Sequence, residues 1–412
     1  MKNARNQVVR AQEWRSGLLL VTAGLLLFET LTGLSLYLLP FSVPNQIMVL
    51  LHTVFGLAFV APFAWYQIRH WLLYRDVKMH HVKLTGYLAM VTVVIAGVSG
   101  LVLTYQALFQ IKISKAWDVA HVISTFALIA ATLPHLIAIV IRDLKAREAE
   151  SLQPVVAAEK KFTLNTVLVT VGLLALVALC MYAYEPPKLA NEFPQDYSFL
   201  YGPDRPFAPS LARTSTGGAF DDRSMAGSQS CGGSLCHEQI VKEWEVSAHR
   251  YAAMDPAFQA VQKVMGHQNG PESTRYCGGC HDPISLFSGT KNIFRDDLTT
   301  LIGYQEGVSC IACHAIKETD VKGNANYVIT QPRRYMFELQ EGKAARFASD
   351  FLIRAYPEYH IATLQHRLFK SPEFCAACHK QFIDAEINKV GWVQLQNQYD
   401  NWRKSRWNHP GD

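Results

Sequence analysis

The chain has 412 residues, of which 50% are hydrophobic and 18% are charged, and its formal net charge is +5. This length favours more than one domain, and the averages conceal an apolar first 185 residues followed by a polar remainder. The small positive balance argues against a nucleic-acid partner. Eight of the nine cysteines form four pairs that each precede a histidine, which argues against a disulfide framework.

Five apolar runs in the first part are each long enough to cross a bilayer. They cover residues 17–39, 47–71, 84–103, 119–141 and 162–184. The first run is too long for the apolar core of a signal peptide and shows no small-residue cleavage site, so we predict a retained helix. Thirteen lysines and arginines lie on the N-terminal side of the membrane, against two in the opposite loops. The positive-inside rule therefore predicts a cytoplasmic N-terminus in a bacterial inner membrane and a periplasmic C-terminal part.

Two of these runs carry pairs of histidines on a single helical face. His52 and His70 are eighteen residues apart, which is five whole turns of 3.6 residues. The fourth run carries His121 and His135, which are fourteen residues apart and also share a face. Because the second and fourth runs cross in the same direction, the first histidine of each pair faces its counterpart, and so does the second. We therefore predict two haems b, each held between two histidines.

Other roles remain open for polar residues of this part. His70 also fits a position at the membrane interface, and His80 and His81 in the next loop are competing ligands. Glu29 lies mid-span, where an unpaired carboxylate is costly. It fits either a proton path for quinol chemistry or a hydrogen bond to a neighbouring helix.

The polar part contains four haem-attachment motifs. Three have the strict pattern Cys-x-x-Cys-His, in which two thiols bond to one haem and the histidine becomes an iron ligand. The first pair has four residues between its cysteines, and a disulfide or an accidental pair of neighbouring cysteines is the alternative there. We predict four covalent haems c. The motifs are Cys231, Cys236 and His237; Cys277, Cys280 and His281; Cys310, Cys313 and His314; and Cys375, Cys378 and His379.

The remaining histidines of the polar part are candidates for the second ligand on each iron. They are His249, His267, His360, His366 and His409. Five candidates suffice for four irons, and an iron with two histidine ligands has no open position for substrate. We expect His249 on a helix that continues from the first motif, and we expect His409 to fray with the terminus.

The sequence thus predicts three parts. Residues 1–185 form a five-helix transmembrane dihaem cytochrome b domain, residues 186–229 a proline-rich connector, and residues 230–412 a periplasmic tetrahaem cytochrome c domain. The fold class is an all-α membrane bundle followed by a mostly helical, haem-packed multihaem cytochrome c domain. The connector contains too many prolines for a long helix, so we expect an extended strap, with a flexible linker as the alternative. The stretch YVITQPRRYMFEL is expected to form a short strand pair.

The segments CHEQIVKEWEVSAHRYA, RYCGGCHDP, GVSCIACHAI and SPEFCAACHKQF resemble the multihaem cytochrome c family typified by the tetrahaem electron carrier of ammonia-oxidising bacteria. The resemblance covers about residues 229–412 and implies closely packed haems in a sheet-poor fold. Two features depart from it, namely the wider first motif and the ending WRKSRWNHPGD, which leads us to expect further motifs on a partner or lost from this chain. The membrane part more weakly resembles the dihaem cytochrome b subunits of formate dehydrogenases and hydrogenases, which implies quinone exchange.

These patterns predict a cytochrome that oxidises quinol, with menaquinol favoured, and passes electrons to a periplasmic cytochrome or other redox subunit. It would be an oxidoreductase component of a larger complex, with membrane lipid and the quinone pool as partners and no nucleic acid. One alternative is a membrane-tethered multihaem enzyme that acts on a small nitrogen or sulfur species, with the helices as an anchor only. Candidate quinone-site residues are Arg75, Asp76, Lys78, His80 and His81 on one face, and Tyr105, Gln106, Trp117 and Asp118 on the other.

Overall fold

The structure is a computed structural model that describes residues 10–145, 153–294, 296–383 and 385–408. It divides into two compact units, and each is described by itself. The first unit holds Met1–Pro186 together with two later segments, Tyr335–Phe337 and Gly342–Tyr356. The second unit holds Pro187–Arg334, Glu338–Glu341 and Pro357–Asp412.

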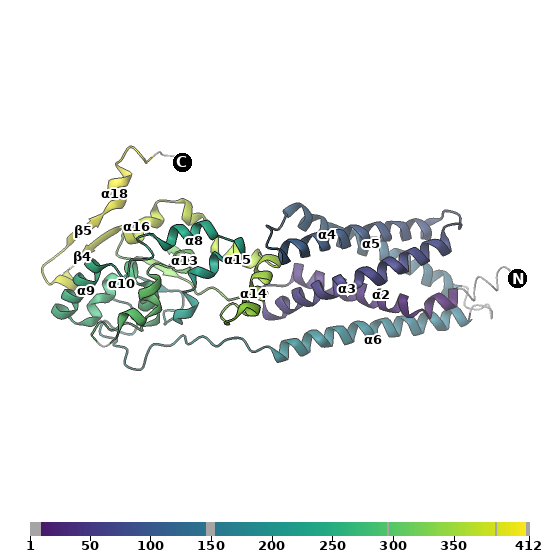
Figure 1. Cartoon of the computed structure of the whole chain (residues 1–412), viewed down its shortest axis with the longest axis horizontal. Helices are drawn as coiled ribbons and strands as arrows, with labels where there is room; N and C mark the ends of the chain where they lie inside the picture. The colour runs from purple at the N-terminus through teal and green to yellow at the C-terminus, as the bar shows by residue number, and fades with distance from the viewer. Residues whose placement is uncertain (1–9, 146–152, 295, 384, 409–412) are drawn as a thin grey trace. The chain divides into compact units, whose positions relative to one another are not determined.

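Within the described residues, five helices of the first unit are long and apolar enough to cross a membrane (Figure 1). They are α2 (Gly17–Leu38), α3 (Val43–Tyr74), α4 (His81–Leu108), α5 (Lys115–Lys145) and α6 (Gln153–Ala183). The five predicted runs are therefore confirmed as helices. Several helices extend past the apolar run because polar residues cap them: Ser42 accepts a hydrogen bond from the Asn45 N–H, and His80 accepts one from the Lys83 N–H.

The five helices pack as an up-and-down bundle, with α4 antiparallel to α5, and with α2 antiparallel to α3 and parallel to α6. A small core joins Leu25, Phe59, Val93 and Leu128, one from each of α2 to α5. Many other apolar side chains of the bundle face outward. Such an apolar exterior suits lipid rather than water, so the bundle indicates association with membrane lipid.

Two segments from late in the sequence complete the first unit at the end of the bundle that holds Val43. The longer one contains α14 (Lys343–Ala355), which packs on α3 and α4. The Met336 N–H donates to Gln46 Oε1 at 2.8 Å, and Asn45 Nδ2 donates to the Tyr356 hydroxyl at 3.4 Å. The sequence alone assigned both segments to the C-terminal part. We call this end of the bundle the His52 end, and the opposite end the His70 end.

The regular structure of the second unit consists mainly of short helices joined by turns and loops. Its α-helices are α7 (Ser228–Cys231), α8 (Glu238–Glu245), α9 (Pro256–Asn269), α10 (Arg275–His281), α11 (Pro283–Ser288), α12 (Ile302–Glu306), α13 (Cys310–His314), α15 (Glu358–Leu364), α16 (Glu373–His379), α17 (Ala385–Asn388) and α18 (Gln398–Arg403). Its 3-10 helices are η2 (Asp222–Ser224), η3 (Gly233–Leu235), η4 (Pro271–Thr274), η5 (Leu298–Thr300) and η6 (Arg367–Lys370). Helix is the main regular structure of this unit, but more of its described residues lie in turns and loops than the predicted mostly helical fold implied.

Strands are few and short. A three-stranded sheet has the order β1-β3-β2, and a hairpin pairs β4 with β5. The strands are β1 (Arg213–Thr214), β2 (Ile316–Thr319), β3 (Tyr327–Ile329), β4 (Lys380–Ile383) and β5 (Val393–Asn397). The strand pair expected within YVITQPRRYMFEL is wrong, because only β3 forms there and its partners come from residues 213 and 316 onward. Pro332 has no N–H to continue the ladder.

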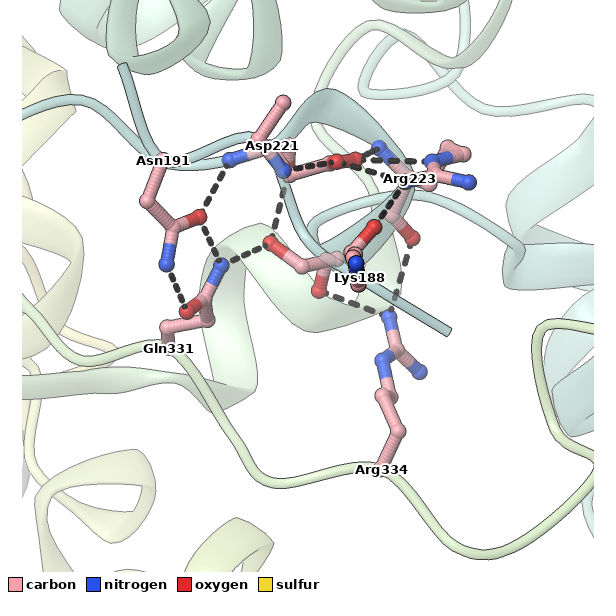
Figure 2. A network of polar contacts seen from close by, with 8 residues as sticks. Lys188, Asn191, Asp221, Arg223, Gln331 and Arg334 are labelled. Carbon is pink, nitrogen blue, oxygen red and sulfur yellow. Dashed lines mark hydrogen bonds and ion pairs between the residues drawn. The ribbon is translucent and has the colours of Figure 1, made fainter. Parts of the chain in front are cut away.

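The proline-rich connector packs into the core of the second unit. Phe207, Phe220 and Met225 are each at most 2% exposed and join a core that includes Phe287 and Ile329. Polar side chains hold the same segment (Figure 2). The Asp221 carboxylate accepts hydrogen bonds from the Ala190 N–H at 2.7 Å and from Arg223 Nη2 at 2.7 Å. The connector is therefore an ordered strap and not a flexible linker.

The Asp221 carboxylate is expected to stabilise this strap in a pH-dependent way. Its hydrogen bonds with Arg223 hold the pKa of Asp221 below its usual range. The stabilisation is therefore present above the unfolded pKa of about 4 and is lost as the pH falls through the lower folded pKa. Asp221→Asn should lower the free energy of unfolding by about 1–3 kcal/mol at pH 7, and the difference should shrink in acid. Thermal unfolding followed by circular dichroism at pH 7 and pH 3 measures this.

The neighbouring Asp222 offers a matched control. Burial raises the pKa of Asp222 above its usual value, so its charge opposes folding at pH 7. Asp222→Asn should leave the unfolding temperature unchanged or raise it. A larger loss of stability in Asp222→Asn than in Asp221→Asn would contradict the assignment of the strap to Asp221.

Candidate haem-binding sites

Three of the four cysteine motifs lie on short helices that present both thiols on one face. The strict motifs occupy α10, α13 and α16, each of which ends at the motif histidine. In an α-helix, residues three apart in sequence are neighbours on the surface. Two thiols that point the same way are the arrangement that the two vinyl groups of one haem require.

The wider first motif reaches a similar closure by a different local structure. Cys231 ends α7, and the residues between the two cysteines form the 3-10 helix η3. The His237 N–H donates to the Cys231 carbonyl oxygen at 3.0 Å. In an α-helical Cys-x-x-Cys-His motif the same two residues are four apart and are joined by the helical hydrogen bond. The extra residues therefore bulge out without separating the first cysteine from the histidine.

The cysteines of different motifs contact one another. Cys231 of the first motif forms a thiol hydrogen bond with Cys310 of the third. Cys280 of the second motif forms one with Cys378 of the fourth. Cys313 interacts electrostatically with Cys378, which links the third motif to the fourth. These contacts gather all four motifs into one cluster, in the order first, third, fourth and second.

Two motif histidines face a second histidine. The rings of His237 and His360 have centres 6.4 Å apart, and those of His249 and His379 have centres 6.1 Å apart. Two imidazoles on one metal ion would have ring centres about 6 Å apart, because each metal–nitrogen bond is about 2 Å and the ring centre lies about 1 Å behind the nitrogen. Both pairs therefore fit an iron between them. His249 follows the end of α8 at Glu245 and does not lie on a helix continuing from the first motif.

The other two motif histidines have backbone partners. His281 Nδ1 lies 3.1 Å from the Ala252 carbonyl oxygen, and His314 Nδ1 lies 2.8 Å from that of Leu364. A ligand histidine commonly donates its second N–H in this way, which fixes the tautomer and leaves Nε2 for the metal. Among the residues that the structure describes, neither ring has a ring contact with a second histidine. The His281 ring instead stacks on Phe258, with ring centres 4.3 Å apart.

Two predicted distal ligands lie beside other side chains. His366 Nε2 contacts the Nζ of Lys317 and lies 3.0 Å from the Thr363 carbonyl oxygen. The His267 ring lies 4.7 Å from the ring of Phe294. Within the described part of the chain, neither is paired with a motif histidine. His409 lies outside the described residues.

Burial favours the neutral form of three histidines in this unit. It lowers the pKa of His249, and the nearby His379 lowers it further. It also lowers the pKa of His281, which the Ala252 carbonyl partly offsets, and that of His360. Neutral imidazole is the form that binds a metal ion. The electrostatics at these three histidines therefore suit binding of a metal ion near neutral pH.

The bundle brings together one of the two predicted membrane pairs. The His52 and His121 rings have centres 6.2 Å apart, close to the separation of two ligands on one iron. His121 Nδ1 lies 3.0 Å from the Ala96 carbonyl oxygen, which leaves its Nε2 for a metal. Glu29 Oε2 lies 2.9 Å from His52 Nδ1. The Glu29 carboxylate is thus hydrogen-bonded to a neighbouring helix.

Helix α4 holds both histidines of α5 with the same set of groups, used twice. Ser99 Oγ lies 3.2 Å from His121 Nδ1, and a Cβ at Gly100 would lie 3.0 Å from its ring. Fourteen residues earlier, Thr85 and Gly86 take the same places beside His135. Thr85 Oγ1 lies 3.4 Å from His135 Nδ1, a Cβ at Gly86 would lie 2.9 Å from its ring, and the Val82 carbonyl oxygen lies 3.0 Å from Nδ1. The repeat equals the spacing of the two histidines, about 21 Å along a helix.

The fourth membrane histidine sits among polar side chains at the His70 end. His70 Nδ1 lies 3.3 Å from the Tyr66 hydroxyl and 3.6 Å from Glu13 Oε2. His70 and His135 interact electrostatically, but among the described residues their rings are not in contact. The structure therefore places His70 near His135 without bringing the two rings of this second predicted pair into contact.

Some residues named as quinone-site candidates have structural roles. His80 caps α4, and Lys83 Nζ donates to the Arg75 and Val77 carbonyl oxygens at 2.8 Å and 2.6 Å. At the other end, Gln106 Oε1 accepts from the Ser114 N–H at 3.0 Å and shapes the loop between α4 and α5. The sequence analysis did not predict the repeat of Thr85–Gly86 and Ser99–Gly100. Its period of fourteen residues equals the separation of His121 and His135, and this match could have been found in the sequence.

Cysteine motifs on a helical scaffold, histidine pairs at ligand spacing and membrane-length helices define a class, the membrane-bound multihaem cytochromes c that transfer electrons. Residues 231–315, which include the first three motifs, match the family described as "Cytochrome c554 and c-prime". The match supports a multihaem cytochrome c-like C-terminal region with covalently bound haem c. The comparison with curated proteins gives no match, and neither does the comparison with solved structures.

Proposed function

We propose that the chain transfers electrons between the quinone pool and a periplasmic redox partner through two haems b and four haems c, with quinol oxidation as the favoured direction. One observation carries this proposal. Three histidine pairs, one in the bundle and two among the cysteine motifs, have ring centres 6.1–6.4 Å apart, the spacing expected for two ligands on one iron. The bound haems supply one-electron carriers, and the protein supplies their positions.

In the bundle, α3 and α5 supply the ligands and α4 orients them. His52 and His121 would hold one haem b, and His70 and His135 the other. The repeated α4 groups support two sites rather than one, because the His135 ring has the same partners as the His121 ring. Helix α6 carries no such histidine, and its role is to lead the chain to the second unit.

In the second unit, each Cys pair and motif histidine would hold one haem c. His360 would be the second ligand of the first haem, and His249 that of the fourth. The thiol contacts between motifs support closely spaced haems. Electrons can pass from one bound haem to the next only when the haems lie close together.

The proposed orientation has the His70 end in the cytoplasm and the His52 end facing the periplasm of a bacterial inner membrane. The lysine and arginine bias supports it, and haem c is attached outside the cytoplasm. The partners would be membrane lipid, the quinone pool and a periplasmic cytochrome or redox subunit within a larger complex. Quinol oxidation releases two protons and two electrons, so the proposed quinol site needs an outlet for protons as well as for electrons.

A pyridine haemochrome spectrum of the purified protein tests this function. The expected ratio is four haems c to two haems b, and anaerobic addition of a menaquinol analogue should reduce both kinds of band. Complete reduction by dithionite provides the reference. Detection of four haems c and no haem b would mean that the bundle serves only as an anchor, and it would refute the quinone role.

A second candidate is a multihaem enzyme that acts on a small nitrogen or sulfur species. The observation in its favour is that His281 and His314 have no histidine ring partner among the described residues, so an iron at either place would keep an open position unless another group binds it. Nitric oxide or cyanide distinguishes the two functions. A pure electron carrier should show no spectral change, whereas an enzyme should show a change in one or two haems c.

A further inference from the structure

Glu29 contacts the histidine of α3 that the proposed function assigns to iron. Glu29 lies on α2, and its Oε2 is 2.9 Å from His52 Nδ1. The Glu29 side chain is 12% exposed and that of His52 is 22% exposed. Among the described residues, the second carboxylate oxygen of Glu29 has no hydrogen-bond partner. The His52 ring is therefore the group that fixes where this carboxylate points.

The hydrogen bonds around His52 determine which ring nitrogen carries the proton. Thr32 Oγ1 donates to the Phe28 carbonyl oxygen at 2.8 Å, so it can only accept from His52 Nδ1, which is 2.9 Å away. The Glu29 carboxylate is a second acceptor on the same nitrogen. Two acceptors at Nδ1 favour the tautomer with the proton there, which leaves the lone pair of Nε2 for a metal.

The other membrane histidines lack this arrangement. His121 and His135 each have a backbone carbonyl oxygen 3.0 Å from Nδ1, which is a neutral acceptor. The acid nearest to His70 is Glu13, whose Oε2 is 3.6 Å from Nδ1. That distance is too long for a hydrogen bond. His52 is thus distinguished from these three by a carboxylate at hydrogen-bond distance.

We propose that Glu29 is a positioning residue for His52, and that it lowers the midpoint potential of the haem b that His52 holds. The inference rests on the proposed haem b site. A carboxylate acceptor increases the electron density on the opposite ring nitrogen and makes it a more basic ligand. A more basic axial ligand favours oxidised iron. Gly56 on α3 lies beside the carboxylate, since a Cβ there would be 3.4 Å from Glu29 Oε2, at van der Waals distance.

The test is a redox titration of Glu29→Gln, followed at the haem b absorbance band. The glutamine amide oxygen can still accept from Nδ1, so both haems b should be retained while one midpoint potential rises. The haem c potentials should not move. Low-temperature EPR should show a changed g-value for one low-spin haem b. Unchanged potentials for both haems b in this variant would overturn the inference.

Two more variants separate positioning from a general effect of charge. Glu29→Asp keeps the charge but shortens the side chain, so the contact is lost and the potential should again rise. A wild-type potential in Glu29→Asp would overturn the positioning role. Glu159→Gln removes another buried carboxylate of the bundle, which is 8% exposed and lies on α6 toward the His70 end. It should leave the potential of the haem at His52 unchanged.

The same titrations in a His135→Ala background read a single haem b. That background should retain only the haem at His52, so a shift there cannot come from the other site. Absence of haem b from the unmodified protein would refute the proposed function itself. Retention of both haems with no shift in Glu29→Gln would refute only the inference about Glu29.

Discussion

Replacing His121 with alanine is expected to remove one haem b and leave four haems c. The His121 ring is one of two that face each other at 6.2 Å in the bundle, and His52 alone would leave the haem with a single axial bond. The haem b that His70 and His135 would hold should remain. A pyridine haemochrome spectrum of the purified variant should therefore show the ratio of haem c to haem b change from 4:2 to 4:1.

His81→Ala is the matched control for this substitution. His81 is exposed at the start of α4 and was a competing ligand in the sequence, so its removal should leave two haems b. His121→Ala and His135→Ala combined should leave none. Two haems b in His121→Ala, or one in His81→Ala, would refute the pairing of His52 with His121.

The double variant Cys231→Ser, Cys236→Ser is expected to lose the first haem c, so that the intact mass falls by one haem. We expect attachment despite the wide spacing of this motif, because the His237 N–H still bonds to the Cys231 carbonyl oxygen at 3.0 Å. His237 and His360 also face each other at the ligand spacing. Loss of both thioether bonds removes the covalent anchor, and denaturing mass spectrometry counts the haems that remain.

Cys180→Ser provides the control, since Cys180 lies in α6 and belongs to no motif. It should keep all four haems c. A disulfide between Cys231 and Cys236 is the competing explanation of the first pair. Four haems c retained in the double variant would favour that disulfide and reduce the number of attachment motifs to three.

The helical bundle could be predicted from the sequence because a long apolar run specifies a membrane helix without reference to any other part of the chain. All five runs became helices, and only their ends moved, where Ser42 and His80 provide polar caps. The sequence also predicted that His52 would face His121, since both the spacing and the direction of the helices follow from helix geometry.

Contacts between distant segments could not be predicted in this way. The sequence named both His249 and His366 as candidate second ligands, but it could not predict that His366 contacts Lys317. Nor could it predict that His249 faces His379, which is 130 residues later in the chain. The periodicity of the sequence gives no information about such a contact, because the contact depends on how short helices and loops fold around a common core.

The strand partners of β3 illustrate the same limit. Residues 213 and 316 onward supply them, and nothing in the local pattern of either segment identifies the other. The composition of the connector also predicted a part separate from the haem domain. Its phenylalanines Phe207 and Phe220 nevertheless lie in the hydrophobic core of the second unit. Apolar residues inside a proline-rich stretch were the available signal for that packing.

The return of residues 335–337 and 342–356 to the first unit limits how the gene could be divided. A fragment that stops at residue 186 would encode all five long helices and all four membrane histidines. It would nevertheless uncover Asn45 and Gln46, which are each 1% exposed in the full chain and bond to Tyr356 and Met336. The bundle is therefore not a detachable module, and a chimaera with another cytochrome would have to carry this returning segment to preserve it.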